Sequence, residues 1–223
     1  MTVHAGPTPE ATPDVRRDQM LRAAAELIGE RGFSDTRIAD VAGRVGASPA
    51  LVVYYFGTKD HLLTEALRWS ERAFYADAHA MLAERQGISI RLESLVRLTC
   101  VPRGDKGEST GAWGLWFDLW AQAFRHDGVA RDRIELDQQW RDMIAGLVRD
   151  AVNDREIEDV DVGDFAVTFA ALLDGLSIQV ALEDPVVDPA RAHRIAMRFA
   201  STTLGFDWPA NRRRAAASRR RPR

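Results

Sequence analysis

The residues best suited to chemistry lie near the N-terminus, and that chemistry is hydrogen bonding to nucleic acid. Tyr54 and Tyr55 carry phenol donors, and Lys59 carries an ammonium at the expected start of a helix. A helix N-terminus presents backbone amides and the positive end of the dipole, so these groups can converge on phosphate oxygens. Thr36 and Arg37 can act in the same way at an earlier helix start, which Thr36 is expected to cap.

The spacing around these residues predicts a helix-turn-helix. Apolar residues recur with helical period over residues 38–45 and stop at Gly46, and a second helix opens at Ser48-Pro49 and ends at Gly57. A helix of two turns is not stable alone, so its neighbours must hold it, and such a helix can enter the major groove. Small or apolar residues at its start allow close approach to base edges; they are Ser48, Pro49, Ala50 and Leu51.

Charge gives this segment no general affinity for DNA. The chain carries −3 overall, and seven arginines without any acid occupy residues 210–223, which leaves −10 for the rest. DNA binding must therefore depend on local groups. A helix-turn-helix also occurs as ordinary packing in all-α proteins, so spacing alone leaves both interpretations open.

The segment AAAELIGERGFSDTRIADVAGRVGASPALVVYYFGTKDHLL resembles the N-terminal domain of the TetR family of bacterial transcriptional regulators. The resemblance implies a homodimer with one recognition helix per subunit and a C-terminal effector domain. It implies that residues 36, 54, 55 and 59 contact the DNA backbone. It also implies that residues 37 and 48–51 lie near DNA bases. The chain departs from the family pattern at Val53, where Tyr is frequent, and at Tyr55, where His is frequent.

The predicted fold class is all-α, with about nine helices, because helical periodicity dominates and no stretch alternates with period two. We expect a disordered N-terminus over 1–13 and a helix-turn-helix domain over 14–58. We expect an effector-binding and dimerisation domain over 59–208 and a disordered Arg-rich tail over 209–223.

An aromatic stripe marks the second half of the chain. Its members recur at i, i+3, i+4, i+7 and i+11 and are Trp113, Trp116, Phe117, Trp120 and Phe124. The stripe is either core or the wall of an effector site between helices, and a pocket wall is also core. Asp118 beside the indoles would suit a cationic ligand. This half resembles BetI-type regulators, the choline-responsive branch, and that looser resemblance does not identify choline as the ligand.

The last two helices have broad apolar faces, and the family resemblance places the dimer there as a four-helix interface. The predicted interface residues are Phe165, Phe169, Leu172, Leu173, Leu176 and Val180. The alternative is that these residues form one intramolecular core.

Other function classes lack support in the sequence. The histidines are scattered, and no metal-ligand spacing, P-loop or nucleophile motif occurs. We therefore predict no metal, no cofactor and no enzymatic activity. Cys100 is the single cysteine, a buried small hydrophobe or a thiol sensor. No apolar run reaches the ~18 residues that a membrane span needs, and no secretion signal is evident, so we expect a cytoplasmic protein without membrane contact.

The sequence thus favours a repressor that a small-molecule effector of unknown identity releases from a palindromic DNA operator. The alternative is a helical ligand-binding or scaffold protein with a vestigial helix-turn-helix. Substitution of Tyr54 and Lys59 separates the two, because only the regulator loses DNA affinity.

The Arg-rich tail gives a first testable prediction. If it tethers DNA, deletion of residues 210–223 should reduce the slope of log affinity against log salt, because fewer counterions are released on binding. Titration of operator DNA at several salt concentrations measures this slope. An unchanged slope would show that the tail is only a solubilising end.

Overall fold

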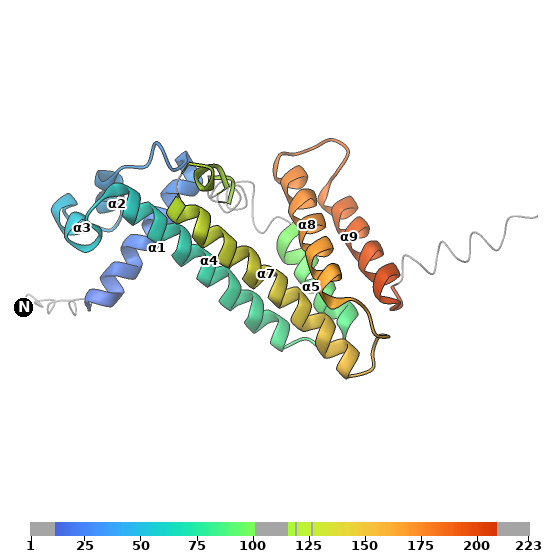
Figure 1. The fold of residues 1–223 in the computed structure, drawn as a ribbon. Helices are drawn as coiled ribbons and strands as arrows, with labels where there is room; N and C mark the ends of the chain where they lie inside the picture. Colours follow the sequence, from blue (N-terminus) through green and yellow to red (C-terminus); the bar gives the residue numbers. More distant parts are fainter. Residues whose placement is uncertain (1–11, 101–115, 119, 126, 209–223) are drawn as a thin grey trace, which may run out of the picture.

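The computed structural model describes residues 12–100, 116–118, 120–125 and 127–208. Within these ranges the chain forms helices and no strand, which confirms the expected all-α class (Figure 1). The helices are α1 (Pro13–Arg31), α2 (Ile38–Arg44), α3 (Pro49–Phe56), α4 (Lys59–Ala83), α5 (Ile88–Cys100), α7 (Asp127–Asn153), α8 (Val162–Ala181) and α9 (Pro189–Leu204). Residues 116–118 and 120–123 are also helical.

Local sequence explains where the short helices begin and end. The Ser48 hydroxyl accepts the Leu51 N–H at 3.2 Å, and Pro49 takes the first helical position, so α3 begins as predicted. It ends at Gly57, whose φ of +72° suits glycine. At the N-terminus, Pro13 is the first residue of α1 and not part of a disordered segment, because proline is well suited to that position. Residues 1–11 and the tail from 209 lie outside the described residues.

α4 joins the two halves of the molecule. Its first turns pack against α1 and α3, and its later turns pack against α5 and α7. In Figure 1, α1–α3 lie at one end of α4, and α8 and α9 lie at the far end of the bundle. One 25-residue helix therefore runs from the helix-turn-helix into the bundle.

α8 is the most apolar helix of the bundle and packs against α5, α7 and α9. By length and composition it could cross a membrane, but much of it is buried inside the protein, as in the core helix of a bundle. Ser177 on α8 lies 3.4 Å from the Cys100 sulfur, and burial raises the pKa of that thiol. This environment favours the interpretation of Cys100 as a packing residue.

The residues predicted for the dimer interface occupy the inner face of α8. Phe165, Phe169, Leu173, Leu176 and Val180 are buried within the chain, and Leu172 is half-buried. The Phe165 and Phe169 rings stack on each other and on Phe199 of α9, with centroids 5.2–6.1 Å apart. The predicted interface is therefore corrected: α8 is apolar on two faces, and these residues form intramolecular core.

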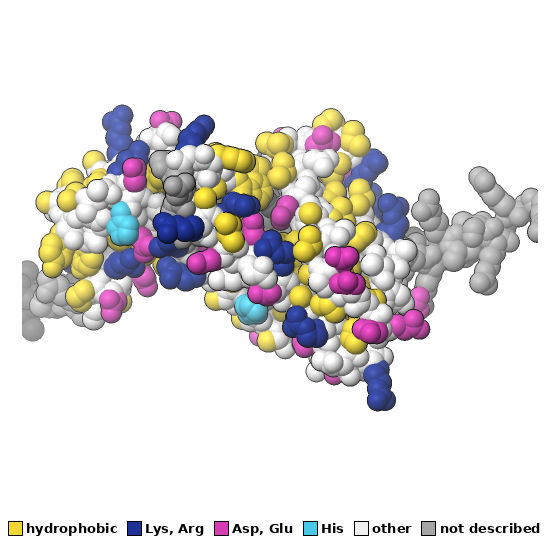
Figure 2. Space-filling model, in the orientation of Figure 1, with side chains coloured by type: hydrophobic (Ala, Val, Ile, Leu, Met, Phe, Trp, Pro, Cys, Tyr) yellow, Lys and Arg dark blue, Asp and Glu magenta, His cyan; other side chains and the backbone are white. Residues whose placement is uncertain are grey.

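The surface carries mixed charge. Figure 2 shows Lys and Arg interspersed with Asp and Glu over the middle of the visible face, while apolar side chains gather near α3 and near the α8–α9 end. Some arginines of the first helices are neutralised by ion pairs, such as Arg44–Glu30 at 2.6 Å and Arg17–Glu65 at 2.8 Å. Contact with a polyanion must therefore come from individually placed groups.

Candidate DNA-binding surface and effector site

α3 presents an exposed face held by a buried one. Val52 and Phe56 are buried and anchor α3, together with Val41 and Ala42 of α2. Predicted DNA-binding residues lie on the opposite side: Ser48, Pro49 and Ala50 are exposed, Leu51 and Tyr55 are half-buried, and Tyr54 is 82% exposed. The start of α3 and the Tyr54 phenol are thus accessible to a nucleic acid.

Val53 also lies on this accessible side of α3. Its side chain is exposed, whereas its neighbour Val52 is fully buried. The departure from the family's frequent tyrosine therefore falls at a surface position. A valine there offers no hydrogen bond to phosphate.

Thr36 and Arg37 take different places from those expected. The Thr36 side chain is fully buried and its hydroxyl donates to the Gly32 carbonyl at 2.8 Å, so it does not cap α2. Arg37 is the residue before α2, and its N–H donates to the Asp40 carboxylate at 3.2 Å. The expectation for Thr36 as a cap is therefore corrected, since its hydroxyl closes the preceding turn; Arg37 remains exposed at the helix start.

Lys59 begins α4 and also fixes the turn between α1 and α2. The Thr58 hydroxyl accepts the His61 N–H at 3.2 Å, and the Lys59 ammonium donates to the Ser34 carbonyl at 2.7 Å. An ammonium has three donors, so Lys59 can keep this bond and still meet a phosphate. It sits at the positive end of the α4 dipole, as the sequence predicted.

An aromatic cluster lies between α4, the helical residues 116–118 and 120–123, and α7. The Phe74 ring of α4 has its centroid 6.2 Å from Trp116 and 6.3 Å from Trp140. Trp120 is 6.2 Å from Trp116 and 6.0 Å from Phe117. Of the predicted stripe, Trp116 thus meets an aromatic ring of another helix, and Trp120 and Phe117 adjoin it within their own segment. Phe74 and Trp140 are members of the cluster that the stripe alone did not include.

The remaining stripe residues do not join this cluster. Phe124 is 92% exposed, because the helix ends at residue 123 and Phe124 lies in the following turn. Its prediction as an effector-site residue is corrected for this reason. Trp113 lies outside the described residues.

A buried acid of α4 and a half-buried acid of α8 both act on Tyr75, the neighbour of Phe74. Glu71 of α4 is 4% exposed, and its Oε2 atom has no hydrogen-bond partner among the described residues. Burial raises the pKa of Glu71 to about 8, with repulsion from Asp137 of α7 as a second cause. Burial, again with repulsion from Asp137, raises the pKa of Asp174 of α8 to about 6.

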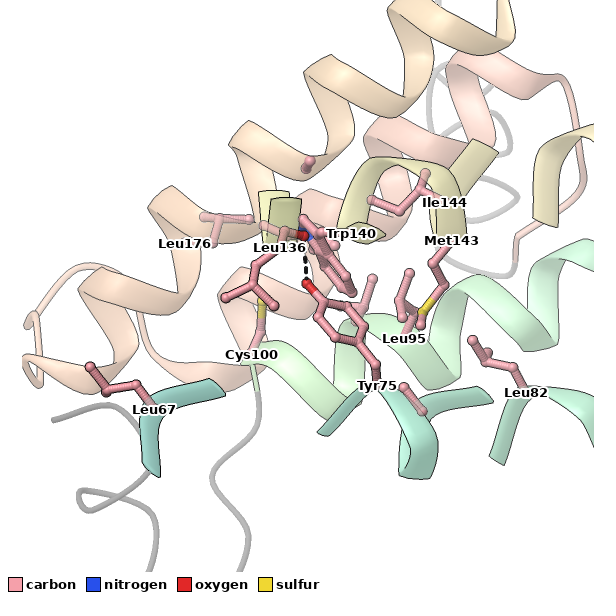
Figure 3. Packing of buried hydrophobic residues seen from close by; sticks show 14 of the residues in the cluster. Leu67, Tyr75, Leu82, Leu95, Cys100, Leu136, Trp140, Met143, Ile144 and Leu176 are labelled. Atoms are coloured by element: carbon pink, nitrogen blue, oxygen red, sulfur yellow. Dashed lines mark hydrogen bonds between the residues drawn. The ribbon is translucent and has the colours of Figure 1, made fainter. Parts of the chain in front are cut away.

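Tyr75 lies one turn beyond Glu71, beside the same acids. Its hydroxyl donates to the Leu136 carbonyl at 2.9 Å, which Figure 3 shows together with the neighbouring Trp140 ring. Burial, Glu71 and Asp137 all raise the pKa of Tyr75, so it stays a neutral donor. The sequence analysis missed Glu71, although positions 63, 67, 71 and 75 form an i, i+4 row that is otherwise apolar or aromatic.

Asp118 connects the two halves of the chain. Its Oδ2 atom accepts the Phe33 N–H at 2.8 Å, across 85 positions of sequence. A Cβ atom at Gly32 would lie 3.4 Å from the same oxygen. The suggestion that Asp118 faces a ligand is thus corrected: it binds the α1–α2 turn, while its helix carries Trp116, Phe117 and Trp120.

The fold and these two sites define a class of protein: a helix-turn-helix DNA-binding regulator with a helical ligand-binding domain. Residues 20–66 match the model of bacterial regulatory proteins of the tetR family, and residues 91–205 match the C-terminal model of BetI-type transcriptional repressors. The chain therefore belongs to the TetR family, with a BetI-type C-terminal domain.

Individual relatives agree with this assignment. The HTH-type transcriptional regulator BetI of Escherichia coli strain K12 is 29% identical over 203 residues, which cover 86% of this chain and 96% of the relative. A putative transcriptional regulator from Saccharomonospora viridis, solved in complex with choline, is 26% identical with a TM-score of 0.72, over 82% and 94% of the two chains. These relatives are transcriptional regulators, and members of the family bind DNA operators and small-molecule effectors.

The fold itself accommodates unlike ligands. The regulator FadR from Bacillus subtilis, solved in complex with stearoyl-CoA, has a TM-score of 0.64 at 16% identity, over 85% of this chain and 98% of that one. At that identity the likeness concerns the fold alone. The fold alone therefore does not identify an effector, which has to be argued from the side chains of this chain.

Removal of the Asp118 carboxylate should destabilise the protein. Asp118→Ala leaves the Phe33 N–H without its acceptor in a partly buried place, at a cost of about 1–3 kcal/mol in the free energy of unfolding. Asp118→Asn keeps an acceptor oxygen and should cost less. Urea unfolding at fixed protein concentration measures both.

The matched control for this test is Asp142→Ala, which removes an exposed hydrogen bond from Gln138 on the surface of α7. It should change stability by less than about 0.5 kcal/mol. An Asp118→Ala variant as stable as this control would contradict the structural role given to Asp118.

Proposed function

We propose that this chain is a cytoplasmic homodimeric repressor that binds a palindromic operator through α3 and is released by a small organic cation. The observation that carries the effector class is the buried Glu71 carboxyl group, whose Oε2 atom has no hydrogen-bond partner within the described part of the chain. Glu71 lies three residues before Phe74 of the aromatic cluster on the same helix. Carboxylate and aromatic faces together bind alkylammonium groups through ion pairing and cation–π attraction.

DNA binding is proposed for the N-terminal domain, residues 14–58, with the first turn of α4. Base-edge approach is assigned to residues 48–51 at the start of α3, and phosphate contacts to Arg37, Tyr54, Tyr55 and Lys59. The accessibility of the α3 start supports this assignment. Thr36 acts indirectly, since its buried hydroxyl shapes the turn that carries Arg37.

Dimerisation is proposed through the outward face of α8, within the effector and dimerisation domain at residues 59–208. The outward residues are spaced by three or four positions and are Val167, Ala171, Gly175, Ile178 and Leu182. This row is apolar, and the small residues at its centre allow two helices to approach closely. Two copies of the chain can therefore bury this face against each other, with α9 beside it.

The cation is proposed to bind at Glu71 between α4, the residues 116–123 and α7. The choline complex of the Saccharomonospora viridis neighbour supports a quaternary ammonium as the class of ligand. Binding there would shift Trp116 and Trp120, whose helix holds the α1–α2 turn through Asp118. Movement of that turn, and of α4 at Lys59, changes how two recognition helices fit the half-sites.

The proposed dimer predicts that charge on the outward face of α8 separates the subunits. Val167→Arg should give a monomer of about 25 kDa, because an arginine would be desolvated in the interface. Ile134→Arg on α7 is the control, since Ile134 is 57% exposed and Val167 is 56% exposed. Light scattering after gel filtration measures both masses. A monomeric Ile134→Arg variant beside a dimeric Val167→Arg variant would show that the interface does not lie on the outward face of α8.

Operator binding tests the proposed function. Genomic DNA selected by the purified protein should contain a palindrome, and Lys59→Gln should weaken binding to it about tenfold or more, through the loss of a charge-assisted contact in each subunit. Choline at saturation should raise the operator Kd at least tenfold, the range of typical allosteric coupling. Fluorescence anisotropy measures both effects.

The control is Lys106→Gln, at the other lysine of the chain. It should leave operator affinity unchanged. Operator binding that tolerates Lys59→Gln and Tyr54→Phe together would favour the scaffold alternative. Operator binding that choline does not alter would leave the repressor in place and contradict the cationic effector.

A further inference from the structure

Glu71 occupies a place in the bundle that its charged form could not occupy alone. Leu67 and Tyr75, one turn to each side, are buried core residues of the same row on α4. The charged group that raises the pKa of Glu71 is Asp137 of α7, whereas Arg141 of the same helix acts on the neighbouring Tyr75. An isolated carboxylate in such a place has a high desolvation cost, so the free protein holds a neutral carboxylic acid there.

Three polar groups near Glu71 have hydrogen-bond or ion-pair partners of their own. Tyr75 donates to the Leu136 carbonyl, and Asp137 is paired with Arg133 at 2.5 Å. Arg141 of α7 donates to Gln138 at 2.9 Å. Asp174 faces the same region from α8 and acts on Tyr75. Among the described residues, the Oε2 atom of Glu71 is thus left without a hydrogen-bond partner.

A second buried group points to the same ligand. Trp140 is 8% exposed, and its Nε1 has no hydrogen-bond partner among the described residues. Its ring lies 6.3 Å from Phe74 and, in Figure 3, beside Tyr75. An indole N–H can only donate, so the ligand that satisfies it carries an oxygen acceptor besides its positive charge.

We propose that the cationic effector binds at Glu71 in exchange for a proton. The neutral carboxylic acid of the free protein gives its proton to solvent as the ammonium group enters, and the carboxylate and the cation form an ion pair. The effector adds its positive charge to the site, and the released proton takes one positive charge away. Affinity for a permanently charged effector then rises with pH. This inference deepens the proposed function and rests on it.

The direction of the pH dependence follows from the protonation states. With the pKa of Glu71 at about 8, the free protein carries the proton at neutral pH, and its release opposes binding. Each unit of pH below 8 should therefore weaken binding about tenfold, and above 8 the affinity should level off. Asp174, with a pKa of about 6, can add a second proton only at lower pH.

Calorimetry with choline tests the exchange. Titration of the wild-type protein at pH 7, in two buffers of different ionisation enthalpy, should give about one proton released per choline bound. The choline Kd should fall about tenfold from pH 6 to pH 7. The neutral isostere 3,3-dimethylbutan-1-ol should bind without proton release and with a Kd that does not change with pH.

Variants at Glu71 and Glu135 complete the test. Glu71→Gln keeps the size and neutrality of the protonated side chain, and it should abolish proton release and raise the choline Kd at least tenfold at pH 8. Glu135→Gln, at an exposed glutamate of α7, should leave both unchanged. Operator affinity without effector reports whether each variant is folded.

The outcomes separate this inference from the proposed function. Choline binding without proton release, at a Kd independent of pH, would overturn the exchange and leave the cationic effector in place. Binding of the neutral isostere but not of choline would overturn both. If neither choline nor the neutral isostere binds, both the assignment of a cationic effector to this site and the proton exchange are wrong.

Discussion

The continuity of α4 is the constraint on which the rest of the structure depends. Lys59, at its first turn, holds the α1–α2 turn through Ser34, and Glu71 lies twelve residues further along the same helix. At 1.5 Å per residue these two positions are about 18 Å apart on one rigid element. A displacement of α4 at Glu71 would therefore be passed along the helix to Lys59, the end proposed to face DNA.

The Asp118 bond adds a second connection between the same two regions. α4 passes the aromatic cluster on one side, and the residues 116–123 border it on the other. Both elements are hydrogen-bonded to the α1–α2 turn. The Lys59 ammonium donates to the Ser34 carbonyl, and the Asp118 carboxylate accepts the Phe33 N–H. A ligand that changes the spacing between Phe74 and Trp116 thus acts on one turn from two sides, which favours a rotation of the N-terminal helices over a local distortion.

Sequence reasoning predicted elements well where local chemistry decides them. Ser48-Pro49 and Gly57 gave both ends of α3, and Gly32 gave the end of α1, because caps and glycine conformations are local properties. The buried Glu71 could also have been found, since it interrupts an apolar i, i+4 row.

Features set by tertiary packing could not be predicted in this way. Periodicity placed Phe124 on the aromatic stripe, but the helix stops one residue before it. It also placed core residues of α8 in a dimer interface, because the helix is largely apolar and the sequence pattern does not distinguish a face buried within the chain from one buried between subunits. The Asp118–Phe33 bond joins residues 85 positions apart, and no local pattern indicates it.

A buried acid is a costly way to bind a cation, and that cost has a regulatory consequence. A charged carboxylate exposed to water would bind an ammonium weakly and with little effect on structure, since solvent screens the pair. Glu71 is instead buried between α4 and its neighbours, where burial raises its pKa to about 8 and favours the protonated form. In the proposed exchange, entry of a cation would convert that core contact into an ion pair, so the two states would differ in packing as well as in charge. Only such a difference between the two states lets a ligand alter DNA affinity.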